Sequence, residues 1–172
     1  MAFDELIEEA KRKFAIQDIF LCESKVWSNR QLALGSSIQD PGVQYKLDEK
    51  NECSVSESVG PAAGSKMFYV QYFIGTSVRV FAGRDGENDE DKLLATITAT
   101  FVVRYLSDSM PSHELIAAFN DHAVHHAWPY WREYVESITT RIRVPTVVLP
   151  LRVIPPQLQQ QSQPPELVKS DG

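Results

Sequence analysis

Three histidines lie close together in the last third of the chain and form its most chemically suggestive cluster. His122, His125 and His126 lie just after Asp121, and His122 and His126 are four residues apart. If this segment is helical, that spacing places two imidazoles on one helix face, where both can bind one metal ion. A zinc site takes about three or four ligands, however, and the only other histidine is His113. We therefore expect polar helix residues here and no metal. A metal-dependent or small-molecule enzyme that uses His122 and His126 stays the alternative.

The acidic run at residues 85–91 resembles a calcium-binding loop in composition only. Such a loop requires glycine at its sixth position and a bidentate glutamate at its twelfth. This chain has Glu90 and Thr96 at those positions. We interpret the run as a charged hairpin tip that keeps a sheet edge soluble. An acidic surface that binds one folded partner, in a dimeric adaptor, is the alternative.

Neither cysteine has the surroundings of a catalytic nucleophile. Cys22 and Cys53 have no histidine nearby in the sequence, and no Gly-x-Ser-x-Gly motif occurs. Gly83 and Gly86 lie in an expected turn between two strands, whereas a phosphate-binding loop needs closely spaced glycines before a helix. We therefore expect neither catalysis nor a cofactor.

The composition is that of one ordinary globular domain. The chain has 172 residues, of which 43% are hydrophobic, 10% aromatic and 23% charged, with a formal net charge of −6. An acidic chain repels phosphate backbones and anionic lipids, so we expect no nucleic-acid or membrane partner. Two cysteines are too few for a disulfide framework, and the acidic N-terminus lacks the features of a signal peptide. These features favour a cytoplasmic protein.

The last residues differ in composition from the rest of the chain. Residues 155–172 hold four of the ten prolines and a run of three glutamines. Such a segment offers little that can be buried. We expect a single domain over residues 1–154, followed by a flexible, Pro/Gln-rich tail over residues 155–172.

Alternating and helical patterns predict the elements that position these residues. Apolar residues at spacings of three and four predict an N-terminal helix over residues 3–14, with acidic residues first and basic residues last. Alternation of apolar and polar residues predicts four strands, the second of them interrupted. A long, unusually apolar crossover at residues 28–42 joins the first two. The strand ranges are 15–27, 43–59, 67–82 and 93–105.

After Pro111 the pattern becomes helical. A short apolar face at residues 115–119 predicts one helix, and a stripe at residues 131–142 predicts a longer one. Pro129 must lie in the first turn of this second helix or kink a longer one. The predicted fold is therefore α+β, with a four-stranded antiparallel sheet, an N-terminal helix and a long C-terminal helix.

Large apolar side chains are concentrated in two segments. Trp27, Leu32, Leu34 and Ile38 crowd the crossover, although a loop normally avoids such residues unless they pack or bind a partner. The long helix carries four aromatic residues at 128–134, for which core or oligomer packing is the simplest interpretation and ligand contact the alternative.

The segment that begins with Trp-Pro-Tyr-Trp-Arg-Glu-Tyr at residues 128–134 resembles the SecB family of export chaperones. In that family the main helix opens with an aromatic-Pro-Tyr-x-Arg-Glu signature, and a proline followed by alternating apolar residues comes next. Family members that serve general export have a glycine where this chain has Ile142-Arg143, and an asparagine where it has Val148. The matching positions are Pro129, Tyr130, Arg132, Glu133, Pro145 and Leu149.

The resemblance implies an ATP-independent holdase chaperone that forms a homotetramer, a dimer of dimers. Its partners would be unfolded or nascent polypeptides, with the SecA motor or an antitoxin as further partners in protein export or toxin-antitoxin control. The implied oligomer interface is the stripe of the long helix. Its residues are Trp131, Tyr134, Val135, Ile138 and Ile142. The implied client-binding residues are Trp27, Leu32, Leu34, Ile38, Tyr45 and Leu47.

Overall fold

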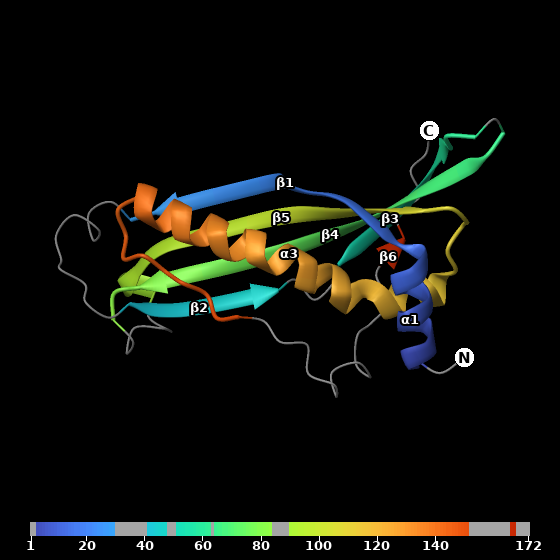
Figure 1. Ribbon diagram of the computed structural model, residues 1–172. Helices are drawn as coiled ribbons and strands as arrows, with labels where there is room; N and C mark the ends of the chain where they lie inside the picture. The colour runs from blue at the N-terminus through green and yellow to red at the C-terminus, as the bar shows by residue number, and fades with distance from the viewer. Residues whose placement is uncertain are drawn as a thin grey trace.

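Helices cover one face of a twisted antiparallel sheet (Figure 1). The computed structural model describes residues 3–29, 41–47, 51–62, 64–83 and 90–151, together with the backbone of residues 166–167. The helices are α1 (Phe3–Lys13), a short 3-10 helix, η2 (Glu90–Lys92), and α3 (His113–Arg141). The strands are β1 (Ala15–Ser28), β2 (Gly42–Leu47), β3 (Glu52–Val59), β4 (Lys66–Phe81), β5 (Leu93–Ser107) and β6 (Glu166–Leu167).

The sheet has β1 at one edge, then β5 and β4, and both β2 and β3 along the far side of β4, with the short strand β6 paired in parallel beyond β3. The predicted antiparallel α+β architecture is confirmed, with two differences in strand count, one of which is the short parallel strand β6. The predicted second strand is formed as two strands, β2 and β3, which pair with successive stretches of β4. Residues 48–51 separate them, where the alternation of the sequence is also interrupted.

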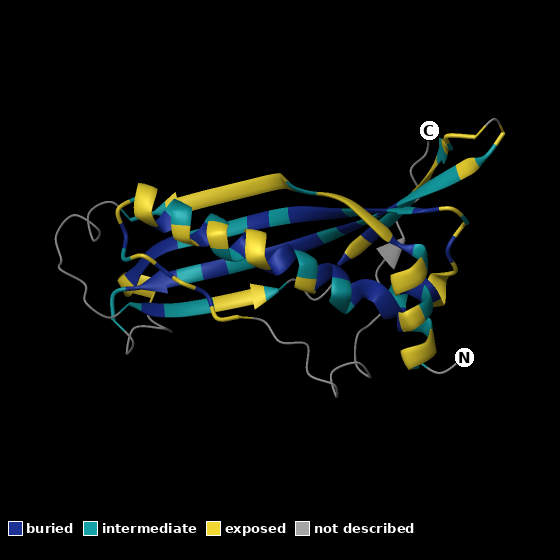
Figure 2. Cartoon of the chain, viewed as in Figure 1, coloured by how far each residue is buried: buried dark blue, intermediate teal, exposed yellow. Residues whose placement is uncertain are grey.

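Strand β5 has the two-faced pattern that its sequence predicts. Its odd-numbered residues from Leu93 to Tyr105 are buried, and Phe101 and Tyr105 contact aromatic rings of α3. Thr96, Thr98 and Thr100 are half-buried on the opposite face. We call the α3 side the inner face and the threonine side the outer face. Figure 2 shows β4 and β5 mostly buried, whereas β1 is exposed along much of its length.

Helix α3 is one continuous helix, so the prediction of a short and a long helix is wrong. It begins after Ser112, whose Oγ accepts a hydrogen bond from the Leu115 backbone N–H at 3.2 Å. Pro129 lies in its interior and cannot donate to the His125 carbonyl. Both residues are exposed, so water can supply the missing hydrogen bond to that carbonyl and the helix can continue.

The end of α3 has the hydrogen bonds of a Schellman motif. The Val144 N–H donates to the Thr139 carbonyl at 3.2 Å, and the Arg143 N–H donates to the Thr140 carbonyl at 3.3 Å. Arg143 has φ of 58°, the left-handed conformation that glycine normally supplies at this position. The chain then turns back along α3 as a segment that we call the strap, residues 144–151.

Helix α1 packs against the first half of α3 at one end of the molecule (Figure 1). Ile7 and Ala10 are buried, and Phe14 follows directly, 5.2 Å from the Phe119 ring and 6.0 Å from the Tyr105 ring. The predicted N-terminal helix is therefore confirmed and contributes to the core. Among the described residues, no helix is long and apolar enough to cross a membrane.

Candidate functional site

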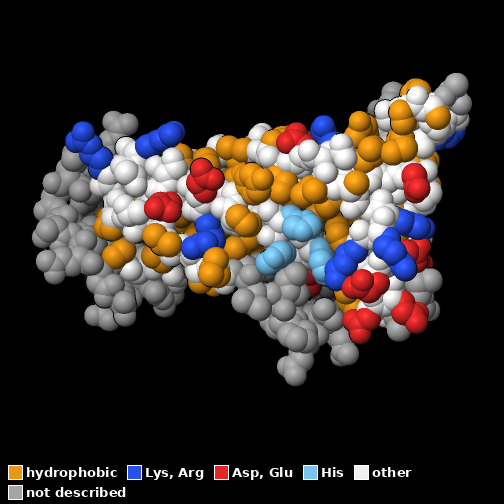
Figure 3. All heavy atoms as spheres, viewed as in Figure 1, with side chains coloured by type: hydrophobic (Ala, Val, Ile, Leu, Met, Phe, Trp, Pro, Cys, Tyr) orange, Lys and Arg blue, Asp and Glu red, His pale blue; other side chains and the backbone are white. Residues whose placement is uncertain are grey.

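Exposed large apolar side chains lie beside α3 on both of its sides. On the β2 side the exposed side chains are Tyr45, Val148 and Leu151, from β2 and the strap, and together with the partly buried Leu47 they form what we call the β2–strap surface. Tyr45 is 50% exposed, Val148 63% and Leu151 76%. Monomeric proteins rarely expose large contiguous apolar patches, and such patches commonly mark binding sites. Figure 3 shows such hydrophobic side chains on the face that carries α3.

Two hydrogen bonds from α3 hold the strap in place. Arg132 Nε donates to the Leu149 carbonyl at 2.7 Å, and Trp128 Nε1 donates to the Pro150 carbonyl at 2.8 Å. The Trp128 ring also lies 5.8 Å from the Tyr45 ring of β2. Helix, strap and β2 therefore form one connected unit.

Alternation within the strap separates buried from exposed side chains. Val144, Val147 and Leu149 are buried in the core, whereas Val148 and Leu151 face solvent. The chain thus displays apolar side chains on a backbone that its neighbours fix. The alternating apolar run of the sequence was a signal for this segment, but the sequence did not reveal which side chains would be exposed.

The family-motif residues fall into two groups. Arg132 and Leu149 form the strap contact, and Pro145 is half-buried in the strap. Pro129, Tyr130 and Glu133 are exposed on α3. Part of the motif therefore has a structural role that its spacing did not reveal, namely fixing the strap to the helix.

The predicted client-binding residues are not brought together. Tyr45 and Leu47 lie on β2 and face inward, because they pair with Val78 and Thr76 of β4. Trp27 lies on β1 at the opposite edge of the sheet, opposite Thr96 on the outer face, and is 48% exposed. One compact site therefore cannot contain both Trp27 and Tyr45. The remaining predicted residues, Leu32, Leu34 and Ile38, lie outside the described residues.

The predicted oligomer stripe is partly used within the chain itself. Trp131 is 1% and Val135 0% exposed, so both belong to the core and offer no surface to a second copy. Tyr134, Ile138 and Ile142 are only partly buried. The physical reason is that the stripe faces this chain's own sheet, where Trp131 meets the Phe101 ring at 6.4 Å.

A second apolar surface lies between β1 and α3. This β1–α3 surface consists of Leu21, Val26, Tyr130, Tyr134 and Ile138. Leu21 pairs with Phe101, whose ring lies 6.0 Å from that of Tyr134, so strand and helix side chains adjoin on the inner face. Leu21 is 40% exposed, Val26 37% and Tyr130 46%.

The histidines have structural partners on α3 and β5. His126 Nδ1 lies 2.6 Å from the Tyr105 hydroxyl, and the His122 ring stacks on Phe119 at 5.1 Å. Burial lowers the pKa of both histidines, and the charge of Lys11 lowers the pKa of His122 further. His122 Nδ1 is buried without a hydrogen-bond partner. In the part of the chain that the structure describes, no group of three or more metal-ligating side chains occurs.

The remaining chemical candidates also have clear positions. Burial raises the pKa of the Cys53 thiol to about 12, and Cys22 is exposed on β1. Glu90, at the end of the acidic run, pairs with Arg79 of β4, while residues 85–89 lie outside the described residues.

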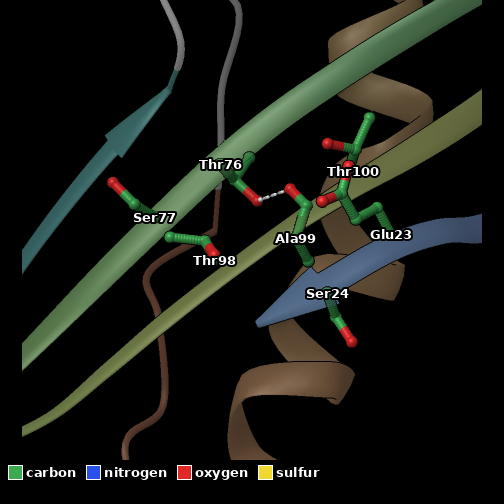
Figure 4. A pocket seen from close by; sticks show the side chains of 7 residues that line it. All are labelled: Glu23, Ser24, Thr76, Ser77, Thr98, Ala99 and Thr100. Carbon is green, nitrogen blue, oxygen red and sulfur yellow. Dashed lines mark hydrogen bonds between the residues drawn. The ribbon is translucent and has the colours of Figure 1, made fainter. Parts of the chain in front are cut away.

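A shallow depression lies on the outer face, lined by polar side chains from β1, β4 and β5 (Figure 4). Its volume is about 140 Å³. Typical ligand pockets are larger, roughly 300–1,000 Å³, and mostly apolar. The depression therefore fits an ordered water or a small polar group better than a substrate. Its lining residues are Glu23, Ser24, Thr76, Ser77, Thr98, Ala99 and Thr100.

The order of strands and the long covering helix define a SecB-like fold. Among solved structures, the chain is similar to the Mycobacterium tuberculosis SecB-like chaperone Rv1957, solved in complex with a ChAD peptide from the Rv1956 HigA1 antitoxin. The identity is 22%, the similarity covers 88% of this chain and 99% of that chain, and the TM-score is 0.58. No protein-family model and no curated protein matches the sequence. The predicted resemblance is thus confirmed at the level of the fold.

Proposed function

We propose that this protein is an ATP-independent chaperone that holds unfolded or nascent polypeptides and is not an enzyme. The observation that carries the proposal is the β2–strap surface, where Tyr45, Val148 and Leu151 are each at least half exposed on a fixed backbone. The SecB-like fold supports it, because a chaperone of that fold binds an antitoxin-derived peptide.

The holding mechanism requires no covalent chemistry. Unfolded chains expose apolar side chains, and their burial against this surface contributes about 25 cal/mol per Å². A folded protein hides those side chains and is not bound. Selectivity for unfolded clients therefore follows from the exposure of apolar groups, without a sequence code or a nucleotide.

We further propose a homotetramer built through the β1–α3 surface. Contact with a second copy there would bury three exposed side chains, Leu21, Val26 and Tyr130. Two partly buried side chains, Tyr134 and Ile138, would become fully buried. Several client surfaces on one assembly would engage one long client, so weak contacts add up to tight holding.

In a cytoplasmic setting, antitoxin-like chains are the favoured clients, because the similar chaperone binds an antitoxin peptide. Exported chains, delivered to SecA, are the second class.

The test is a titration against one polypeptide in two states. Carboxymethylated α-lactalbumin stays unfolded, and native α-lactalbumin serves as the folded control. We expect binding to the unfolded form alone, with no added nucleotide, by an assembly of four chains in light scattering. Equal binding to both forms, or to neither, contradicts the holdase.

A further inference from the structure

A short piece of the chain's own tail is paired with the outer edge of β3, the edge that faces away from β4. In a parallel ladder, Glu166 lies opposite Glu52 and Leu167 lies opposite Cys53 (Figure 1). The tail covers two residues of a strand that has eight. Among the described residues, the rest of this edge, from Ser54 to Val59, has no strand partner.

The edge of β3 is suited to accept a strand. Its pairing with β4 runs from Glu52 to Val59 without a register shift, so its backbone groups are regularly spaced. The strand contains neither proline nor lysine, the residues that commonly block an edge. Every second residue is a small serine from Ser54 to Ser58, which leaves the backbone accessible.

Contacts with the core hold β3 rigidly in place. Cys53 is fully buried, and Val55 packs against the core. Just before the strand, Asn51 Nδ2 donates to Asn120 Oδ1 of α3 at 3.2 Å. Because β3 is already ordered, its pairing with an added segment costs little further conformational entropy.

The opposite edge of the sheet differs. The pairing of β1 with β5 has two irregularities, between Ile16 and Asp18 and between Leu21 and Glu23. Such bulges leave residues unpaired and bend the strand, which is a common protection against edge-to-edge pairing. The β1 and β3 edges are therefore not equivalent, and of these two only the β3 edge is regular.

We propose that the β3 edge is a binding site for an extended polypeptide segment, which the chain's own tail occupies until a client displaces it. This inference rests on the proposed function, since the client is an unfolded chain. Strand addition uses backbone groups, so it suits clients of any sequence.

Residues 152–165 join the strap to β6 and can span at most about 45–50 Å. A tether of that length gives an effective concentration on the order of millimolar. A ladder of two residues is short enough to be displaced.

The test compares two variants that carry the same number of new prolines. Glu166→Pro with Leu167→Pro removes both N–H groups of β6. Gln159→Pro with Gln160→Pro changes the tail outside the ladder. We expect the first variant alone to show at least fivefold faster hydrogen exchange at the start of β3. We also expect its Kd for carboxymethylated α-lactalbumin to be at least threefold lower.

A cross-linking experiment locates the client on the sheet. In a Cys22→Ser background, a benzophenone is attached at Ser56→Cys on β3 or, as the control, at Lys25→Cys, exposed on the outer face of β1. We expect the unfolded client to cross-link several-fold more at position 56, and more still when the tail prolines are present. Equal yields at both positions, or an unchanged Kd despite faster exchange, would overturn the inference.

The proposed function and this inference fail in different ways. If no variant binds the unfolded client, the holdase is wrong, and a synthetic peptide of residues 160–172 then tests the edge by itself. That peptide must restore slow exchange at β3 in the variant with prolines at 166 and 167. Unchanged exchange in that variant, or no effect of the peptide, would overturn the inference regardless of client binding.

Discussion

Arg132 Nε donates a hydrogen bond to the Leu149 carbonyl at 2.7 Å and so fixes the strap to α3. The contact joins a helix residue to a residue that lies 17 positions later. It holds Leu149, which is 1% exposed, in the core and leaves its neighbour Val148 facing solvent. One charged side chain thus supports both the stability of the strap and its display of apolar groups.

Replacing Arg132 by methionine should lower the free energy of unfolding by about 1–2 kcal/mol, because the Leu149 carbonyl loses its donor. Client binding should weaken as well, since the strap would no longer be held. Urea denaturation and the α-lactalbumin titration measure the two effects. Glu133→Gln, an exposed change next to it on α3, is the matched control and should change neither. Equal stability of both variants would contradict this role of Arg132.

Arg143→Gly should stabilise the protein by about 0.5–1 kcal/mol. Arginine at φ of 58° is strained, whereas glycine adopts this conformation freely. Some of the gain is lost because glycine also makes the unfolded chain more flexible. Arg141→Gly, in the last turn of the helix, should instead destabilise by about 0.5–1 kcal/mol. The two midpoints of thermal unfolding should therefore shift in opposite directions.

Tyr45→Ser combined with Val148→Ser should weaken binding of carboxymethylated α-lactalbumin about tenfold, because apolar area on the β2–strap surface is lost. Trp27→Ser removes an equally exposed aromatic ring at the other edge of the sheet and should leave the Kd within about twofold. A larger effect of Trp27→Ser than of the double variant would place the client site elsewhere.

Ile138→Asp should reduce the assembly mass measured by light scattering, because a charge would enter the β1–α3 surface. Thr140→Asp, exposed on the same helix, should leave the mass unchanged. Circular dichroism must show that both variants keep their helix content. An unchanged mass for a folded Ile138→Asp variant would contradict the interface.

Stability should fall as the pH drops below about 6.5, the ordinary pKa of histidine. Burial lowers the pKa of His122 and His126 in the folded state, so the unfolded state binds more protons in this range. The two histidines therefore make their full contribution to the free energy of unfolding above the ordinary pKa, and this contribution is lost as the pH falls. His122→Gln should reduce the difference in melting temperature between pH 7.5 and 5.5. His125→Gln should reduce it less, because burial is the largest cause of both lowered pKa values and the charge of His125 a smaller one.

The local patterns of the sequence were enough for most elements. Alternation along residues 93–105 predicted β5 and its two faces, because side chains in a strand point to opposite sides. The split at Pro129 was wrong, since a proline penalty is local, whereas the packing of Trp128 and Trp131 stabilises the helix on both sides of it.

Periodicity defines faces within one element, but strand order and register place those faces in the molecule. For this reason the sequence could not separate Trp27 from Tyr45, which lie at opposite edges of the sheet. Nor could it decide that Trp131 and Val135 pack on their own sheet while Val148 stays exposed. These outcomes depend on contacts between residues distant in sequence, such as Arg132 with Leu149 and Trp128 with Tyr45. The sequence by itself determined the strands, the helix faces and the acidic charge, and the tertiary structure decided which apolar residues are left for a partner.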